Sequence, residues 1–213
     1  MDPITPASAK ETSQTLLSQS GRPSLAVAKT GLLFFMATLT IVFLMLISSY
    51  LVGQNRVSWV ALPQLNILWL NTFWLVLSSL MLEWARRAAQ KQELLSSSSE
   101  SVALVALQQI RMGLLASGAF ALFFLIGQGV AWQELNRSGF FLGANQSSSF
   151  FFLLTGLHGL HLLGGLVAWG GTTLKILVEK DFVSLGRIGL CALYWHYLLL
   201  VWLAMFGLIL FAK

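Results

Sequence analysis

Five long apolar stretches, separated by shorter polar links, dominate the pattern of this chain. They cover about residues 30–52, 63–85, 111–135, 149–178 and 185–212. A helix needs about 20 mostly apolar residues to cross a bilayer, and each stretch reaches that length. The pattern therefore predicts an all-α, polytopic membrane protein with five transmembrane helices packed as a bundle.

The polar segments predict how the chain is divided. Residues 1–29 are mostly polar, rich in Ser and Thr, and hold three of the four prolines, so we expect a disordered tail. The first 24 residues lack the apolar stretch of a cleavable signal. Residues 30–213 then form one transmembrane domain. Residues 86–100, which end in a serine run, predict a flexible linker, and Pro63 suits the first turn of the second helix.

Composition and charge support a membrane protein and orient it. Hydrophobic residues make up 56% of the chain and charged residues 10%, whereas soluble domains carry about 25% charged residues. Ten of the thirteen lysines and arginines fall on the side of the N-terminus and of the second and fourth links. The positive-inside rule then predicts a cytoplasmic N-terminus and an external C-terminus. No basic stripe with interleaved aromatics appears, so nucleic acid is not an expected partner.

The three histidines are candidates for metal or haem ligands. His158 and His161 are three residues apart and so share one face of the fourth predicted helix, and His196 of the fifth helix could approach them. The alternative is that each imidazole bonds a carbonyl, a neighbouring helix or a lipid headgroup. No carboxylate lies within a turn of them in sequence, and we favour this alternative. We therefore predict no metal site, and the single Cys191 cannot form an internal disulfide.

Small residues line the fourth predicted helix and indicate close helix contact. They are Gly156, Gly159, Gly164, Gly165 and Ala168. Small side chains let helix backbones approach closely in membranes. The partner helix belongs either to this chain or to another subunit, and the sequence does not distinguish the two.

Carboxylates are scarce in the predicted helices. Glu83 and Glu134 lie at the ends of the second and third stretches, and the other three stretches have no Asp or Glu in their interiors. A transporter or proton carrier usually keeps an acidic residue at mid-membrane, and no Ser-His-Asp or Cys-His arrangement is available. We expect no catalytic residue in this chain, and no redox or hydrolytic chemistry by the chain alone.

Three motifs carry a family resemblance: TGLHGLHLLGG at residues 155–165, YWHYLLLVW at residues 194–202, and the pattern LNT…SS…EWARR over residues 70–87. In this order and spacing the chain resembles subunit III of haem–copper respiratory oxidases, the cytochrome c oxidase and quinol oxidase group. The resemblance covers about residues 30–213. The chain looks like a shorter bacterial form that lacks the first two of seven spans.

The resemblance implies a non-catalytic subunit of a terminal oxidase in the bacterial cell membrane, of the cytochrome c type. It would pack on subunit I beside subunit II, which hold the haems and copper, and bind no redox cofactor itself. The chain would retain phospholipid in a cleft, stabilise subunit I and support proton uptake. It would take part in aerobic electron transport, and a larger respiratory assembly is a further expected partner. By matched position, the residues that line the cleft or hold lipid headgroups are Trp84, Arg86, Arg87, His158, His161, Trp195 and His196.

The chain departs from the family pattern where relatives carry carboxylates. The matching positions hold Leu39, Leu199 and Ala131, which puts a direct proton relay in doubt and leaves the packing and lipid roles. The alternative assignments within the family are a subunit of a quinol oxidase or of a nitric oxide reductase. The alternatives outside the family are a freestanding transporter and a membrane b-type haem protein.

Overall fold

The computed structural model describes residues 25–55, 59–60, 62–63, 65–94, 100–179 and 185–211, and every regular element among them is helical. The helices are α2 (Leu25–Gln54), α3 (Ile67–Leu94), α4 (Glu100–Arg137), α5 (Gln146–Leu174) with a π-helical extension η1 (Lys175–Glu179), and α6 (Leu185–Phe211). Five of them are long and apolar enough to cross a membrane. The predicted fold class of five transmembrane helices is confirmed.

The helix bounds differ from the predicted stretches in two places. Pro63 lies before α3, which begins only at Ile67, so the prediction that Pro63 opens the helix was wrong. The expected linker at residues 86–100 is largely helical, because α3 runs on to Leu94 and α4 begins at Glu100. Arg, Ala, Gln and Lys all favour helix, so a polar segment extended the helix beyond the apolar stretch. The serine run and the first 24 residues lie outside the described residues, and α2 takes in the last five residues assigned to the tail.

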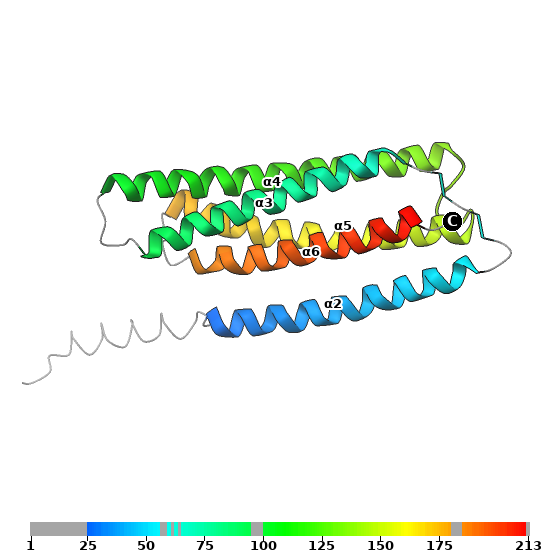
Figure 1. Ribbon diagram of the computed structural model, residues 1–213, viewed down its shortest axis with the longest axis horizontal. Coiled ribbons are helices and arrows are strands. Elements are labelled where there is room, and N and C mark those ends of the chain that lie inside the picture. Colours follow the sequence, from blue (N-terminus) through cyan, green and yellow to red (C-terminus); the bar gives the residue numbers. More distant parts are fainter. Residues whose placement is uncertain are drawn as a thin grey trace, which may run out of the picture.

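The helices run in alternating directions and pack in a definite order (Figure 1). The closely packed hairpin of α3 and α4 rests on α6 through α3, and α5 lies beside both α4 and α6. Helix α2 contacts α5 and α6 and is the least buried of the five spans. The start of α2, the end of α3, the start of α4 and the start of α6 therefore lie at one end of the bundle, as the predicted orientation requires.

Tryptophan side chains join the helices through hydroxyl groups. The indole N–H of Trp202 donates to Thr72 Oγ1 at 2.9 Å, and that of Trp132 donates to Thr155 Oγ1 at 3.0 Å. The hydroxyl of each threonine in turn donates a hydrogen bond to the carbonyl four residues earlier in its helix. The side-chain polar atoms of these two Trp–Thr pairs are therefore all bonded, which matters in hydrocarbon because water is not available as a partner. These bonds connect α6 to α3 and α4 to α5.

The first turn of α5 is held by its cap. Asn145 is extended, with φ −153° and ψ 171°, and its side-chain oxygen accepts the N–H of Ser148 at 3.0 Å. The hydroxyl of Ser147 donates to the carbonyl of Val60 at 2.5 Å. This second bond fixes the start of α5 to the connection between α2 and α3.

Candidate functional site

A polar cluster joins α3 to α6 in the half of the bundle nearer the α3–α4 connection. We call it the Glu83 cluster and define it by Ser79, Glu83, Arg86, Arg87 and His196. Arg86 donates to Glu83 through both Nε and Nη2 at 2.7 Å, and Arg87 Nε donates at 2.8 Å. These pairs are three and four residues apart, the spacing that brings side chains together on a helix. One carboxylate therefore orients two guanidinium groups.

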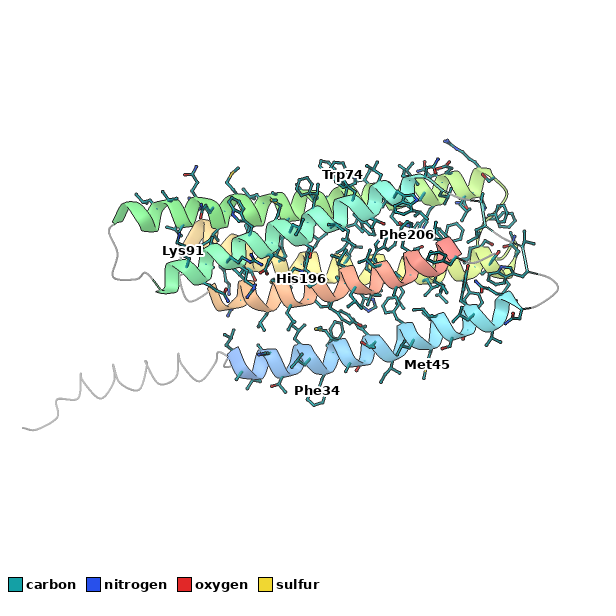
Figure 2. All side chains as sticks on the ribbon, in the orientation of Figure 1. Phe34, Met45, Trp74, Lys91, His196 and Phe206 are labelled. Carbon is teal, nitrogen blue, oxygen red and sulfur yellow. The ribbon has the colours of Figure 1, made fainter. Side chains whose placement is uncertain are left out.

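His196 brings the second helix into the Glu83 cluster. Its Nδ1 lies 2.5 Å from Ser79 Oγ, and its Nε2 lies 3.4 Å from Glu83 Oε2. Figure 2 shows His196 on α6 in the same half of the bundle as Lys91 of α3, with Phe206 toward the opposite end. No Asp or Glu lies within a turn of His196 in the sequence. The carboxylate beside it comes instead from Glu83 of α3.

The Glu83 cluster carries one net positive charge when His196 is neutral, because one carboxylate faces two arginines. The side chain of Glu83 is 17% exposed, that of Arg86 32% and that of Arg87 74%. The carboxylate is therefore the inner group and the guanidinium groups are the outer ones. Arg87 donates to Glu83 through Nε, and among the described residues its two terminal nitrogens have no other partner, so they can meet an anion from outside.

The two predicted tryptophans of the site lie in different surroundings. Trp84 is 42% exposed and adjoins Glu83 in the chain. Trp195 is 1% exposed, and its indole N–H donates to Ser78 Oγ at 2.8 Å. The hydroxyl of Ser78 in turn donates to the carbonyl of Ser117 at 2.7 Å. Trp195 therefore belongs to the packing of α6 on α3 and α4.

The two histidines of the glycine-rich motif also have separate environments. His158 is fully buried, its ring lies 5.3 Å from that of Trp202 and 5.7 Å from that of Phe124, and neither ring nitrogen has a hydrogen-bond partner among the described residues. His161 is partly exposed and faces Phe35 and Phe43 of α2, with Nδ1 2.7 Å from the carbonyl oxygen of its own helix at residue 157. The structure therefore brings neither histidine to the Glu83 cluster.

No metal centre forms within the part of the chain that the structure describes. It contains no group of three or more His, Cys, Asp or Glu side chains placed to hold an ion. Each of the three histidines has a different set of neighbours, as the contacts above show.

The small residues of α5 divide into an inner and an outer set. A methyl group at Gly165 would lie 2.9 Å from Tyr194 Cε1, whereas one at Gly156 or Gly159 would make ordinary contacts with α4 at 3.7 and 4.0 Å. A methyl group at Gly164 would meet nothing within 4 Å, and Ala168 is exposed. The inner set thus packs within the chain, and the outer set faces away from it.

The sequence reasoning missed two polar groups that matter for the geometry. Ser79 was not identified as a partner of His196, although Ser79, Glu83 and Arg86 recur at helical spacing on one face of α3. Asn71 and Gln128 were not identified as partners either. The structure joins them by a bond of 3.3 Å from Asn71 Nδ2 to Gln128 Oε1 in the buried core. Only tertiary contact reveals either pairing.

Comparison with known proteins finds relatives among oxidase subunits. No family model matches the chain. The chain is 32% identical over 92 residues to "Probable cytochrome c oxidase subunit 3" of Nocardia farcinica, which is 43% of this chain and 45% of that protein. The corresponding protein of Mycobacterium leprae is 33% identical over 93 residues, covering 43% and 46%.

A quinol oxidase relative matches over a longer range. "Quinol oxidase subunit 3" of Bacillus spizizenii is 26% identical over 206 residues, which covers 89% of this chain and 87% of that protein. By contrast, the chain spans about half the length of the cytochrome c oxidase relatives that it matches. The five membrane helices and these relatives together support the subunit 3 family of cytochrome c and quinol oxidases.

Proposed function

We propose that this chain is the non-catalytic subunit III of a bacterial haem–copper terminal oxidase of the cytochrome c type. The observation that carries the proposal is the similarity to subunit 3 proteins combined with five membrane helices. In this role the chain packs on subunit I, has subunit II in the same complex, and leaves the haems and copper to those two subunits. The outer small residues of α5, Gly164 and Ala168, are a candidate contact with a partner subunit.

The proposed compartment is the bacterial cell membrane, with the N-terminus in the cytoplasm. The alternating helix directions support this orientation (Figure 1), because they gather the basic links at one end of the bundle. Lys29, Lys91, Lys175 and Arg187 lie near the helix ends on that side, and Arg111 lies farther along α4.

The Glu83 cluster is the proposed site for a phospholipid headgroup. Arg87 offers free guanidinium nitrogens at the surface, and Trp84 and His196 are also partly exposed. Arginine suits phosphate because its donors match the phosphate oxygens. We also propose His161 as a headgroup contact, because it is partly exposed beside α2. His158 and Trp195 are buried, and we do not propose them as headgroup contacts.

Support of proton uptake is proposed to be indirect. Leu39 and Ala131, which stand where many relatives have carboxylates, are buried apolar side chains. Neither can hold or transfer a proton. The chain would therefore act on proton uptake by stabilising subunit I and its lipid, and not by a relay of its own.

A quinol oxidase subunit is the second candidate, favoured by the match along 87% of the Bacillus spizizenii protein. The two candidates differ in the neighbouring subunit II. A copper-binding two-cysteine motif in that subunit indicates cytochrome c oxidase, and its absence indicates quinol oxidase. Oxygen consumption with reduced cytochrome c and with a quinol gives the same distinction in the purified complex.

The test is to purify the complex through an affinity tag on this chain and to compare it with the complex from a deletion strain. We expect oxidase subunits I and II to co-purify, and the complex without this chain to keep its haem spectrum and initial turnover but lose activity faster. Loss of haem on deletion, or a Soret band from this chain expressed alone, would show that the chain is not a cofactor-free subunit.

A further inference from the structure

Asn71 of α3 and Gln128 of α4 form a buried pair of side-chain amides that is only half bonded. Their exposed fractions are 0% and 3%, and Nδ2 of Asn71 donates to Oε1 of Gln128 at 3.3 Å. The other two atoms of the pair, Oδ1 of Asn71 and Nε2 of Gln128, are buried and have no hydrogen-bond partner among the described residues. Buried polar atoms are nearly always bonded, and hydrocarbon offers them no solvent. The pair therefore requires a further partner.

The two amides do not close on each other. Each amide has one donor end and one acceptor end, so two amides that face each other squarely form two N–H···O bonds. Here a single bond forms, and its length of 3.3 Å lies beyond the usual range of about 2.7–3.2 Å. The pair thus keeps one acceptor, on Asn71, and one donor, on Gln128, that do not bond to each other.

The backbone of α4 fixes the position of the Asn71 oxygen. A methyl group at Gly127 would overlap Oδ1 of Asn71, so this oxygen lies directly against the α4 backbone. An amide oxygen has two lone pairs, and a backbone C–H group is only a weak donor to one of them. Oδ1 therefore still needs a strong donor. A methyl group at Gly129, two residues later, would meet nothing within 4 Å.

Neighbouring contacts hold α3 and α4 at this register. Thr72, next to Asn71, accepts the indole N–H of Trp202 at 2.9 Å. The Trp202 ring lies 4.8 Å from the ring of Phe124, which comes one turn before Gln128 on α4. Both rings are fully buried. Because α6 is packed on both helices beside the amide pair, α3 and α4 cannot shift freely to close it.

The further partner must both accept and donate a hydrogen bond. It has to accept from Nε2 of Gln128 and to donate to Oδ1 of Asn71. Exchanging oxygen and nitrogen in both amides again leaves one donor and one acceptor, so the requirement does not depend on how the amides are turned. A metal cation has no lone pair with which to accept, and a fully deprotonated anion has no hydrogen to donate. Water does both, and internal waters bond about three otherwise unsatisfied polar groups.

The position of the pair gives water a short route to it. Asn71 is four residues after Ile67, where α3 begins, so it lies about 6 Å along the helix axis from that end. This end of the bundle is opposite to the one that holds the start of α2 (Figure 1). The pair is therefore close to one end of the α3 span and not at the centre of the hydrocarbon.

We infer that Asn71 and Gln128 bind one internal water molecule, which accepts a hydrogen bond from Nε2 of Gln128 and donates one to Oδ1 of Asn71. The water completes the bonding of both amides and adds a bridge between α3 and α4. The inference concerns the core of the bundle and does not depend on which oxidase the chain serves.

The test is proton NMR of the full chain in detergent micelles, isotopically labelled in its glutamine side chains. We expect a rotating-frame Overhauser cross-peak between water and the Nε2 protons of Gln128, with the sign that marks proximity and not proton exchange. Gln128→Met assigns the signal, because it removes the amide from a side chain of similar length. No water cross-peak at the assigned Gln128 signal would overturn the inference.

Two glycine variants add the same methyl group to α4 with opposite consequences. Gly127→Ala displaces Oδ1 of Asn71 and should abolish the water cross-peak, whereas Gly129→Ala should keep it. If Gly127→Ala fails to fold, Asn71→Leu takes its place, since it removes the acceptor. A cross-peak that persists without the Asn71 acceptor would contradict the bridge.

A density map of the purified membrane protein, at a resolution that shows ordered water, provides a second measurement. We expect a density peak within hydrogen-bond distance of both Oδ1 of Asn71 and Nε2 of Gln128. Two direct N–H···O bonds between the side chains, with no such peak, would overturn the inference.

Discussion

Gly165 and Gly164 provide a sharp test of the packing of α5, because they are neighbours with opposite surroundings. A methyl group at Gly165 would lie 2.9 Å from Tyr194 Cε1 and 3.2 Å from Trp195 Cζ3, whereas carbon atoms in contact prefer about 3.5–4.0 Å. At Gly164 the same methyl group would meet nothing within 4 Å. The two alanine substitutions therefore add the same group to a crowded and to an open position.

The two rings near Gly165 are held and cannot move away easily. Trp195 is 1% exposed and donates to Ser78, and the hydroxyl of Tyr194 donates to the carbonyl of His161 at 3.1 Å. An extra methyl group in such a core costs about 1–3 kcal/mol. Replacing glycine by alanine in a helix also gains up to about 1 kcal/mol, and this gain is common to both variants. The difference between them therefore isolates the packing cost, which we expect to be about 1–3 kcal/mol.

The assay is unfolding of the purified chain in mixed micelles by titration with dodecyl sulfate, followed by helix content and tryptophan fluorescence. Gly164→Ala should unfold at the same or a higher midpoint than the natural chain, and Gly165→Ala at a clearly lower one. If the free energies of unfolding of the two variants agree within about 0.5 kcal/mol, the α5–α6 contact at Gly165 is looser than the structure shows.

Three further predictions concern polar groups. Glu83→Gln should lower the free energy of unfolding by at most about 1 kcal/mol, since the ion pairs are partly exposed. It should also strengthen binding of acidic vesicles, and Glu134→Gln, which removes an exposed carboxylate, is the control. Equal vesicle binding by the two variants would contradict the charge argument. Trp202→Phe should cost about 1 kcal/mol in the same unfolding assay by removing the bond to Thr72, and no change would show that this bond does not hold α6 on α3. His158→Leu should leave the free energy of unfolding unchanged or raise it, because an unpaired buried polar group is replaced by an apolar one, so a large loss would reveal a bound partner of the imidazole.

Much of the candidate site depended on contacts that the sequence does not show. The pairing of Glu83 with Arg86 and Arg87 follows from spacing on one helix, and local geometry is sufficient to predict it. The addition of His196 required α6 to lie beside α3 at one particular register. For the same reason the matched positions His158 and Trp195 were expected near lipid, while the structure buries both. A motif gives the identity of a residue, but its exposure depends on which helices cover it.

The sequence by itself determined the class of the protein, the five spans and the resemblance to the subunit 3 family, since each depends on residue type and on order along the chain. Apolar length decides whether a segment can cross the bilayer, because every backbone polar group must be bonded within it. The tertiary structure decided which face of each helix packs against its neighbours. It divided the glycines of α5 into crowded and open positions, joined Asn71 to Gln128, and brought His196 of α6 to Glu83 of α3. These properties arise from helix register and rotation, which depend on packing between side chains far apart in the sequence.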